Sequence, residues 1–175
     1  MGVGATNKRK GSNAERHYAK FFRDLGYEHC QTSRFSSKQH DNAKIDLMYV
    51  PFNIQIKAGV QKGMNPGKEL FAMKSSIERM FPKGEDVHSK PCVLFHFKQG
   101  DKGLKRTPEM ELVYMSLIQF DVFRDKSRNL EYLCMKEFKF DLNSEFKTIV
   151  GMTLEHFKED VEVIQLAAKL MIIAA

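Results

Sequence analysis

The sequence predicts a single domain of the mixed α/β class, in which helices flank a central mixed β-sheet. The elements expected between residues 12 and 116 follow the order αβββαβ, and a helix pattern between two apolar strand patterns predicts a strand–helix–strand crossover. The chain has 175 residues, of which 42% are hydrophobic, so it is long enough to bury a core of its own. These observations favour one domain over residues 12–175.

The first expected element is a helix that begins at Ser12, because Ser12 and Glu15 have the spacing of a capping box. Residues 1–11 are small, polar and basic, and we expect them to form a flexible N-terminus. The buried face of the helix is marked by an apolar stripe, which consists of Ala14, Tyr18, Phe21, Phe22 and Leu25. Gly26 is expected to end the helix.

Further elements complete the expected core. A strand over residues 27–35 and a polar loop over residues 36–44 come next. Farther along the chain, Asn65 and the proline after it have the chemistry of a helix N-terminus. The nearly continuous apolar run 92–97 predicts a strand that is covered on both faces, and another strand is expected at 112–115.

Residues 45–57 are expected to form a β-hairpin, because two apolar, partly β-branched runs flank a turn that contains proline. Side chains alternate between the faces of a strand, so Gln55 and Lys57 should share one face. If residues 51–52 form the turn, Asp46 lies opposite Lys57. The hairpin would then gather an acid, an amide oxygen and an ammonium on one side of a sheet.

Residues 117–175 are expected to form a C-terminal helical extension. Ser116 and Gln119 have the spacing of a capping box for a short helix. Residues 129–151 fit a strand as well as a helix, and a final helix is expected from about Thr153 to Met171.

The composition limits the possible partners and compartments. Twenty-eight Lys and Arg against 22 Asp and Glu give a net charge of +6, which favours a polyanionic partner, although many domains without one carry such an excess. Cys30, Cys92 and Cys134 are odd in number and lack CxxC spacing, so they predict reduced, buried thiols and no zinc site. No apolar run reaches membrane length and no signal peptide is visible. We therefore expect a soluble, cytoplasmic protein with no membrane partner.

The chain resembles the PD-(D/E)xK nuclease superfamily in three places: the run Lys-Gly-Ser-Asn-Ala-Glu-Arg over residues 10–16, then Asp46, then Gln-Ile-Lys over residues 55–57. The opening run is most similar to that of archaeal-type Holliday junction resolvases. The similarity covers about residues 8–97, and residues 98–175 match no family that we can name. It implies a restriction-endonuclease-like fold with an αβββαβ core and a Mg²⁺-dependent endonuclease that resolves branched DNA as a homodimer, with Mn²⁺ as a substitute ion.

The resemblance also implies a set of site residues. Glu15, Asp46, Gln55 and the main chain of Ile56 would surround Mg²⁺, and Lys57 would lie beside the attacking water. Mg²⁺ prefers hard oxygen ligands and keeps several waters, so few protein ligands suffice. Two departures from the family pattern stand out, because Gln55 replaces the usual acid and Ile45 replaces the usual proline. The residues expected to contact nucleic acid are Lys8, Arg9, Lys10, Arg16, Arg34, Ser36, Lys38 and Lys62.

Each candidate also has a purely structural interpretation. Glu15 stands where a capping glutamate belongs, and Lys57 could be a solvated lysine on a strand. Asp41, in the polar loop, could replace Asp46 as the carboxylate if the expected register is wrong. His96, inside an apolar strand, is expected to be a hydrogen-bonded core residue rather than a ligand.

Two other functions fit the same residues. The chain could be a catalytically weak or inactive nucleic-acid-binding module that kept the fold after position 55 lost its acid. It could also be a nuclease that acts on linear duplex DNA.

Overall fold

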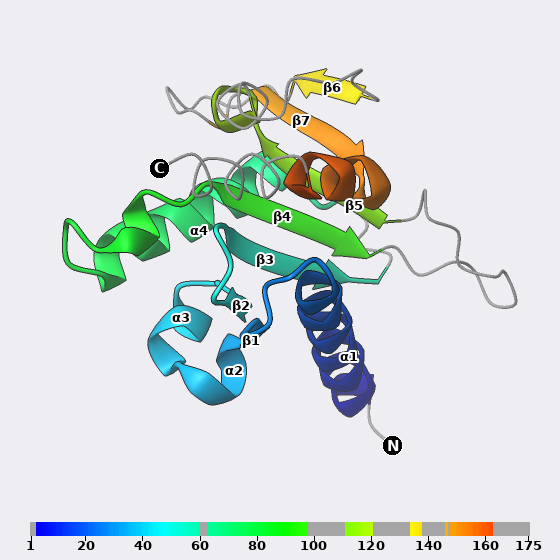
Figure 1. Ribbon diagram of the computed structural model, residues 1–175, viewed down its shortest axis with the longest axis vertical. Helices are drawn as coiled ribbons and strands as arrows, with labels where there is room; N and C mark the ends of the chain where they lie inside the picture. The colour runs from blue at the N-terminus through cyan, green and yellow to red at the C-terminus, as the bar shows by residue number, and fades with distance from the viewer. Residues whose placement is uncertain are drawn as a thin grey trace, which may run out of the picture.

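The computed structural model describes residues 3–59, 63–97, 111–120, 134–137, 146 and 148–162. In these residues the protein has a mixed α/β fold, in which helices flank a mixed β-sheet (Figure 1). The elements before the main sheet are α1 (Val3–Asp24), β1 (Gln31–Thr32), α2 (Ser33–Ser36), α3 (Lys38–Asn42) and β2 (Leu47–Met48). The remaining elements are β3 (Asn53–Ala58), α4 (Pro66–Met80), η1 (Asp86–His88), β4 (Cys92–Phe97), β5 (Glu111–Ser116), β6 (Cys134–Glu137), β7 (Thr148–Thr153) and a helical segment at 154–162.

The main sheet has five strands in the order β3-β4-β5-β7-β6, so β3 forms one of its edges. β3 and β4 are parallel and are joined through α4, as the predicted crossover requires. The other pairs, β4 with β5, β5 with β7 and β6 with β7, are antiparallel. β1 and β2 form a separate two-stranded antiparallel sheet. The predicted order αβββαβ is therefore present, with α2 and α3 inserted between its first two strands.

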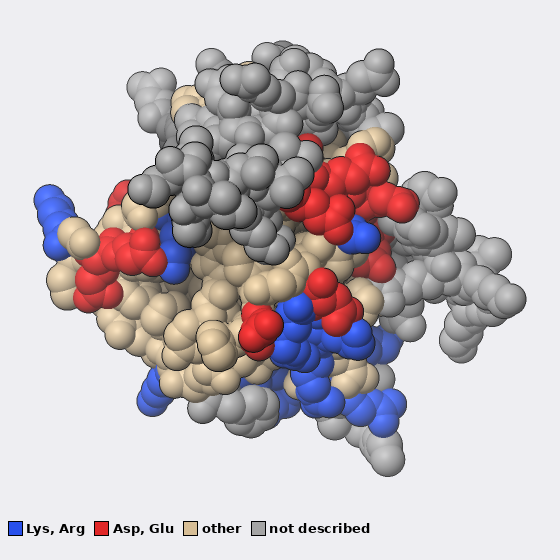
Figure 2. Space-filling model, viewed as in Figure 1, with Lys and Arg blue, Asp and Glu red and all other residues tan. Residues whose placement is uncertain are grey.

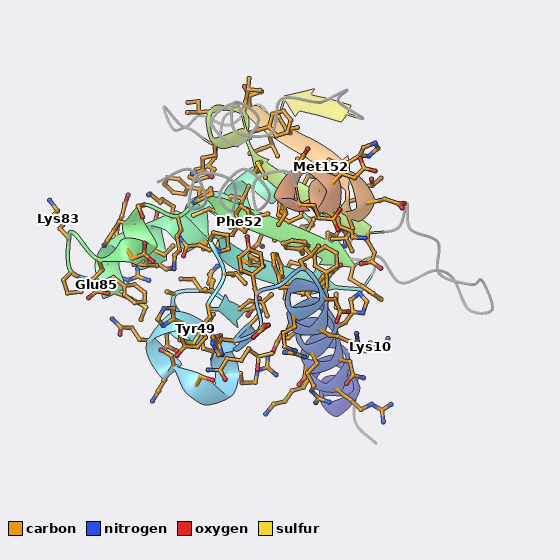
Figure 3. All side chains as sticks on the ribbon, viewed as in Figure 1. Lys10, Tyr49, Phe52, Lys83, Glu85 and Met152 are labelled. Atoms are coloured by element: carbon orange, nitrogen blue, oxygen red, sulfur yellow. The ribbon has the colours of Figure 1, made fainter. Side chains whose placement is uncertain are left out.

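Two hydrophobic cores lie on opposite faces of the main sheet. On one face, α1 and the segment 154–162 cover the sheet, and on the other face α4 covers it (Figure 1). Alternate residues of β4 belong to different cores, with Phe95 facing α1 and Leu94 facing α4. β4 is thus covered on both faces, as its apolar sequence predicted. Phe52, labelled in Figure 3, packs in the core on the α1 side.

The predicted start of the first helix is wrong. α1 begins at Val3, so residues 3–11 are helical and are not a separate segment before the helix. Ser12 and Glu15 consequently lie inside α1, and the Ser12 hydroxyl accepts a hydrogen bond from Arg16 (3.1 Å) instead of capping a helix end. A capping box is a local signal, and the lysine and arginine residues just before it have high helix propensities that allow the helix to extend past it.

The predicted hairpin is also wrong in its pairing. The strand expected at 27–35 is reduced to the two residues of β1, which α2 follows directly. β2 pairs with β1 instead of β3, because residues 49–52 form bends rather than a two-residue turn and Tyr49 adopts a positive φ of 62°. The Asp46 amide donates a hydrogen bond to the Ile54 carbonyl (2.7 Å), so Asp46 lies beside the middle of β3 and not opposite its Lys57.

Several local predictions are confirmed. The Asn65 side chain accepts a hydrogen bond from the Lys68 amide (3.1 Å) and caps α4. Residues 117–120 are helical, and the Ser116 hydroxyl accepts a hydrogen bond from the Gln119 amide (3.2 Å), as in the first half of a capping box. The Gln119 side chain, however, accepts a hydrogen bond from the main chain at the start of β4 (3.0 Å).

The C-terminal extension is not only helical, because β6 and β7 belong to the main sheet. The sequence of residues 129–151 fitted a strand as well as a helix. β6 lies within this range, and β7 begins in it and ends two residues beyond it. The final helix is confirmed over 154–162, and the part expected up to Met171 lies outside the described residues.

The predicted buried thiols and core histidine can be checked as well. Cys30 and Cys92 are buried, as expected, and the side chain of Cys134 lies outside the described residues. His96 is buried and forms a hydrogen bond with the Gly59 carbonyl (3.1 Å), which confirms its predicted structural role. In the part of the chain that the structure describes, no helix has the length and apolar character needed to cross a membrane.

Candidate active site at the free edge of β3

Asp46 is fixed against the free edge of β3 by main-chain and side-chain hydrogen bonds. Its amide donates to the Ile54 carbonyl (2.7 Å), and its carboxylate oxygen Oδ2 accepts from the Ile56 amide (2.6 Å). Its own carbonyl accepts from the Ser33 amide at the start of α2 (2.9 Å). These contacts hold the carboxylate between the sheet edge and α2, and they leave it little freedom to turn away.

Glu15 reaches the same region from α1. Its side chain is buried, with a residue exposure of 6%, and its carboxylate accepts a hydrogen bond from Arg34 of α2 (2.6 Å). Glu15 therefore does not cap α1, and the capping interpretation of this residue is wrong. An ionised carboxylate that is removed from water requires a cation nearby, and Arg34 supplies it.

The pKa values indicate that the acidic side chains of this region influence one another. Burial raises the pKa of the Asp46 carboxyl to about 7, and the negative charges of Glu15 and Asp41 add to the rise, while the Ile56 amide and Lys57 oppose it. Burial also raises the pKa of Glu15, against the effect of Arg34, and Asp41 raises it further. Ionising these carboxyls is therefore costly in the protein without a ligand, and a bound cation would reduce that cost.

Gln55 and Ile56 contribute neutral oxygens at the same level of β3. Gln55 is buried, and its carbonyl oxygen Oε1 has no hydrogen-bond partner among the described residues. Leaving a buried polar atom without a partner costs free energy, so such an oxygen indicates a missing ligand or water. The N–H and C=O groups of one strand residue point to the same side, so the Ile56 carbonyl faces the free edge on which its amide meets Asp46.

Lys57 shares a face of β3 with Gln55, as the alternation of strand residues predicted. Its ammonium lies 3.0 Å from the Glu69 carboxylate in the first turn of α4, and both side chains are about one quarter exposed, at 26% and 30%. Lys57 also lowers the pKa of Asp46, so its charge reaches the candidate site. Lys57 is therefore an ion-paired, partly exposed side chain rather than a fully solvated one.

The donor set fits a hard divalent cation such as Mg²⁺. Two carboxylates, one amide oxygen without a partner and one main-chain carbonyl are oxygen ligands of the kind that Mg²⁺ accepts, with water filling the remaining positions. Among the described residues, no three His, Cys, Asp or Glu side chains gather closely enough to hold a metal ion by themselves. Any metal here would accordingly depend on Gln55 and the main chain of Ile56 in addition to Glu15 and Asp46.

The residues expected to contact nucleic acid are only partly gathered near this site. Arg34 lies in it, bound to Glu15, whereas Ser36 and Lys38 are exposed on α2 and α3. Figure 2 shows Lys and Arg side chains clustered over α1, from which Lys8, Arg9, Lys10 and Arg16 are exposed. Lys8 shares a helix face with Glu15, seven residues later, but Lys10 lies on the side of α1 away from α2 (Figure 3). Lys62 lies outside the described residues.

The fold adds Glu69 and Ser33 to this region, which sequence reasoning missed, and it gives Asp41 a part other than the one expected. Glu69 pairs with Lys57, and Ser33 is fully buried with a hydroxyl that has no partner among the described residues. Asp41, considered only as a replacement for Asp46, is exposed on α3 but acts on both buried carboxyls. Glu69 lies in the first turn of α4, four residues after the N-cap Asn65. That position was the one signal in the sequence that could have pointed to it.

Comparisons with known protein-family models, curated proteins and solved structures found no match to this chain.

One prediction follows from Asp46 without reference to any ligand. The folded protein keeps the Asp46 proton up to about pH 7, whereas the unfolded chain releases it near its ordinary pKa of 3.8. The folded state binds more protons in this window, so the Asp46 contribution to stability is present below it and is lost as the pH rises through it. Asp46→Asn, measured with wild type by urea unfolding in chelator between about pH 4 and pH 8, should gain stability relative to wild type as the pH rises. If the stability of the two proteins changed with pH in the same way, the raised pKa of Asp46 would be contradicted.

Proposed function

We propose that this protein is a metal-dependent DNA endonuclease with a restriction-endonuclease-like fold, and that branched DNA is its substrate. The observation that carries the proposal is that Glu15 from α1 and Lys57 from β3 both act on Asp46, whose carboxylate accepts a hydrogen bond from the Ile56 amide at the edge of β3. The preceding strand residue, Gln55, is buried and its Oε1 has no partner among the described residues. These are the positions that the resemblance to PD-(D/E)xK nucleases selects. A two-fold homodimer is part of the proposal, because a four-way junction offers two equivalent strands to cut.

Each side chain has a defined part in this chemistry. Glu15, Asp46, Gln55 and the Ile56 carbonyl would hold Mg²⁺, which when bound supplies a polarised phosphoryl group and a more acidic water. Lys57 would orient the attacking water or stabilise the negative charge that develops on the phosphate. Glu69 would keep the Lys57 ammonium in place before DNA binds.

The test is a cleavage assay on labelled DNA. A four-way junction, a flap and a linear duplex of the same sequence are incubated with the protein in Mg²⁺, in Mn²⁺ and in EDTA. The proposal expects nicks in the junction that need a metal ion, with slower cleavage of the duplex. Preferential cleavage of the linear duplex would rule out branched DNA as the substrate and favour a nuclease that acts on linear duplex DNA. No cleavage of any substrate in either metal would overturn the enzymatic function itself.

Gln55 favours a second candidate function, a nucleic-acid-binding module without activity, because a neutral amide binds Mg²⁺ less strongly than a carboxylate. Gln55→Glu is expected to tighten Mn²⁺ binding by about tenfold, since a charged oxygen replaces a neutral one at a buried position. Calorimetric titration with Mn²⁺ measures this change. Gln39→Glu, the same substitution at an exposed position of α3, is the control and should leave Mn²⁺ affinity unchanged.

The nuclease and the inactive binding module predict different behaviour of the wild-type protein. Both expect tighter Mn²⁺ binding in Gln55→Glu, but only the nuclease expects the unchanged protein to cut DNA. If cleavage appears in Gln55→Glu alone, the wild type is the binding module. Equal Mn²⁺ affinities in wild type and Gln55→Glu would remove residue 55 from the set of metal ligands.

A further inference from the structure

The ion pair between Arg34 and Glu15 stands at the centre of the candidate site. The Glu15 side chain is 8% exposed and the Arg34 side chain 30% exposed, and their charged atoms are 2.6 Å apart. The residue before Arg34 donates its amide to the Asp46 carbonyl (2.9 Å). The first turn of α2 therefore contacts both carboxylate residues that the proposed function assigns to the metal.

Arg34 and a divalent cation would compete for Glu15. A guanidinium and a metal ion cannot both approach one buried carboxylate without repelling each other, and that repulsion is strong where water is excluded. In the protein without metal, Arg34 already supplies the positive charge that the buried Glu15 requires. Binding of a divalent cation would satisfy the same carboxylate and leave the guanidinium without its partner.

A released guanidinium at this edge of the sheet has an evident alternative partner. Arginine presents five N–H donors in a planar fork that matches the oxygens of a phosphate group, and charge-assisted bonds of this kind are strong. α2 is held beside Asp46 by the main-chain bond of Ser33, so Arg34 stays next to the position of the proposed metal ion.

We propose that Glu15 exchanges Arg34 for a divalent cation, and that the released Arg34 then binds a phosphate of the nucleic acid. Metal and DNA binding are thereby coupled through one ion pair: each ligand strengthens the binding of the other. The inference rests on the proposed function, because it takes Glu15 to be a metal ligand and DNA to be the partner.

The test uses Arg34→Gln and two separate equilibria. Mn²⁺ binding to the protein without DNA, followed by electron paramagnetic resonance at pH 8, should become about tenfold tighter, because Glu15 loses its competing cation. Binding of a labelled four-way junction in Ca²⁺, which replaces Mg²⁺ to avoid cleavage, should become about tenfold weaker, because a phosphate loses a charged donor. Junction binding in EDTA should stay unchanged, since Arg34 is held by Glu15 under those conditions.

Two further variants make these results specific. Arg16→Gln removes an exposed arginine of α1 whose charge also acts on Glu15, and it should weaken junction binding equally in Ca²⁺ and EDTA. Arg34→Lys keeps a positive charge without the planar fork. Its affinities for Mn²⁺ and for the junction in Ca²⁺ should lie between those of wild type and Arg34→Gln. Because it preserves the ion pair, it also serves if Arg34→Gln does not fold.

Several outcomes would overturn the exchange. Weaker Mn²⁺ binding in Arg34→Gln would mean that Arg34 supports the metal ligands instead of competing with the ion. Equal losses of junction affinity in Ca²⁺ and EDTA would make Arg34 an ordinary phosphate contact. If Mn²⁺ binds the wild type, is lost in Asp46→Ala and is unchanged in Arg34→Gln, the exchange fails while the proposed metal site stands. If the wild type binds no Mn²⁺, both proposals fail together.

Discussion

Asp46→Ala and Lys57→Ala are each expected to reduce metal-dependent nicking of a four-way junction by about 1,000-fold or more, which amounts to loss of activity. Asp46 is the carboxylate most firmly held at the site, through the Ile54 carbonyl and the Ile56 amide. Lys57 lies on β3, the strand that carries Ile54 and Ile56, and its positive charge lowers the pKa of Asp46. The measurement is the initial rate of nicking on an end-labelled junction in Mg²⁺, with enzyme in excess of DNA.

Junction binding should be retained in both variants, because neither side chain is part of the basic surface of α1. Asp46→Asn is a useful companion to Asp46→Ala, since its amide oxygen can still accept the bond from Ile56 while it lacks the negative charge. Asp86→Ala and Lys90→Ala remove a different acid–base pair, whose Nζ and Oδ2 atoms lie 2.6 Å apart, and should cut at the wild-type rate. Nicking that persists in both site variants would refute the assignment of the site.

The sequence predicted best those elements whose signals are local. The cap at Asn65 and the apolar run that became β4 each depend on a few adjacent residues, and the structure places both elements as expected. The capping box at Ser12 was just as local, yet α1 starts nine residues before Ser12 and continues nine residues beyond Glu15. A local signal can state that a helix is present, but the preceding residues decide where it begins.

The site was only partly predictable, because its geometry depends on contacts between distant parts of the chain. Nothing near Glu15 indicates that Arg34, 19 residues later, holds its carboxylate. The pairing of β2 with β1 follows from the bends at 49–52, and no pattern in the hairpin sequence distinguished it from pairing with β3. The sequence order of Asp46 and β3 nevertheless brought them together, because a short connection can only return the chain to the adjacent sheet edge.

Phe22→Ala is expected to lower the free energy of unfolding by about 3–5 kcal/mol, the range for removing a large aromatic side chain from a core. Phe22 is fully buried at the junction of α1 with the α1-side core. Its ring lies 5.3–6.4 Å, centroid to centroid, from the rings of Phe21, Tyr27, Phe52, Phe95 and Phe157. Urea unfolding, monitored by circular dichroism, measures the difference in the free energy of unfolding between wild type and Phe22→Ala. The comparison requires the same dependence on urea concentration in both proteins.

The size of this effect also tests whether the segment 154–162 belongs to the same folding unit as α1. Phe157 from that segment contacts Phe22 and Phe95 at centroid distances of 6.4 and 5.3 Å, so one aromatic cluster joins the N-terminal helix, β4 and the C-terminal helical segment. Phe71→Ala, at a position of α4 that is 36% exposed, is the matched control and should cost less than about 1 kcal/mol. A similarly small loss in Phe22→Ala would mean that the cluster packs loosely. Glu15, two turns before Phe22 on α1, would then lack the rigid support that its place beside Asp46 requires.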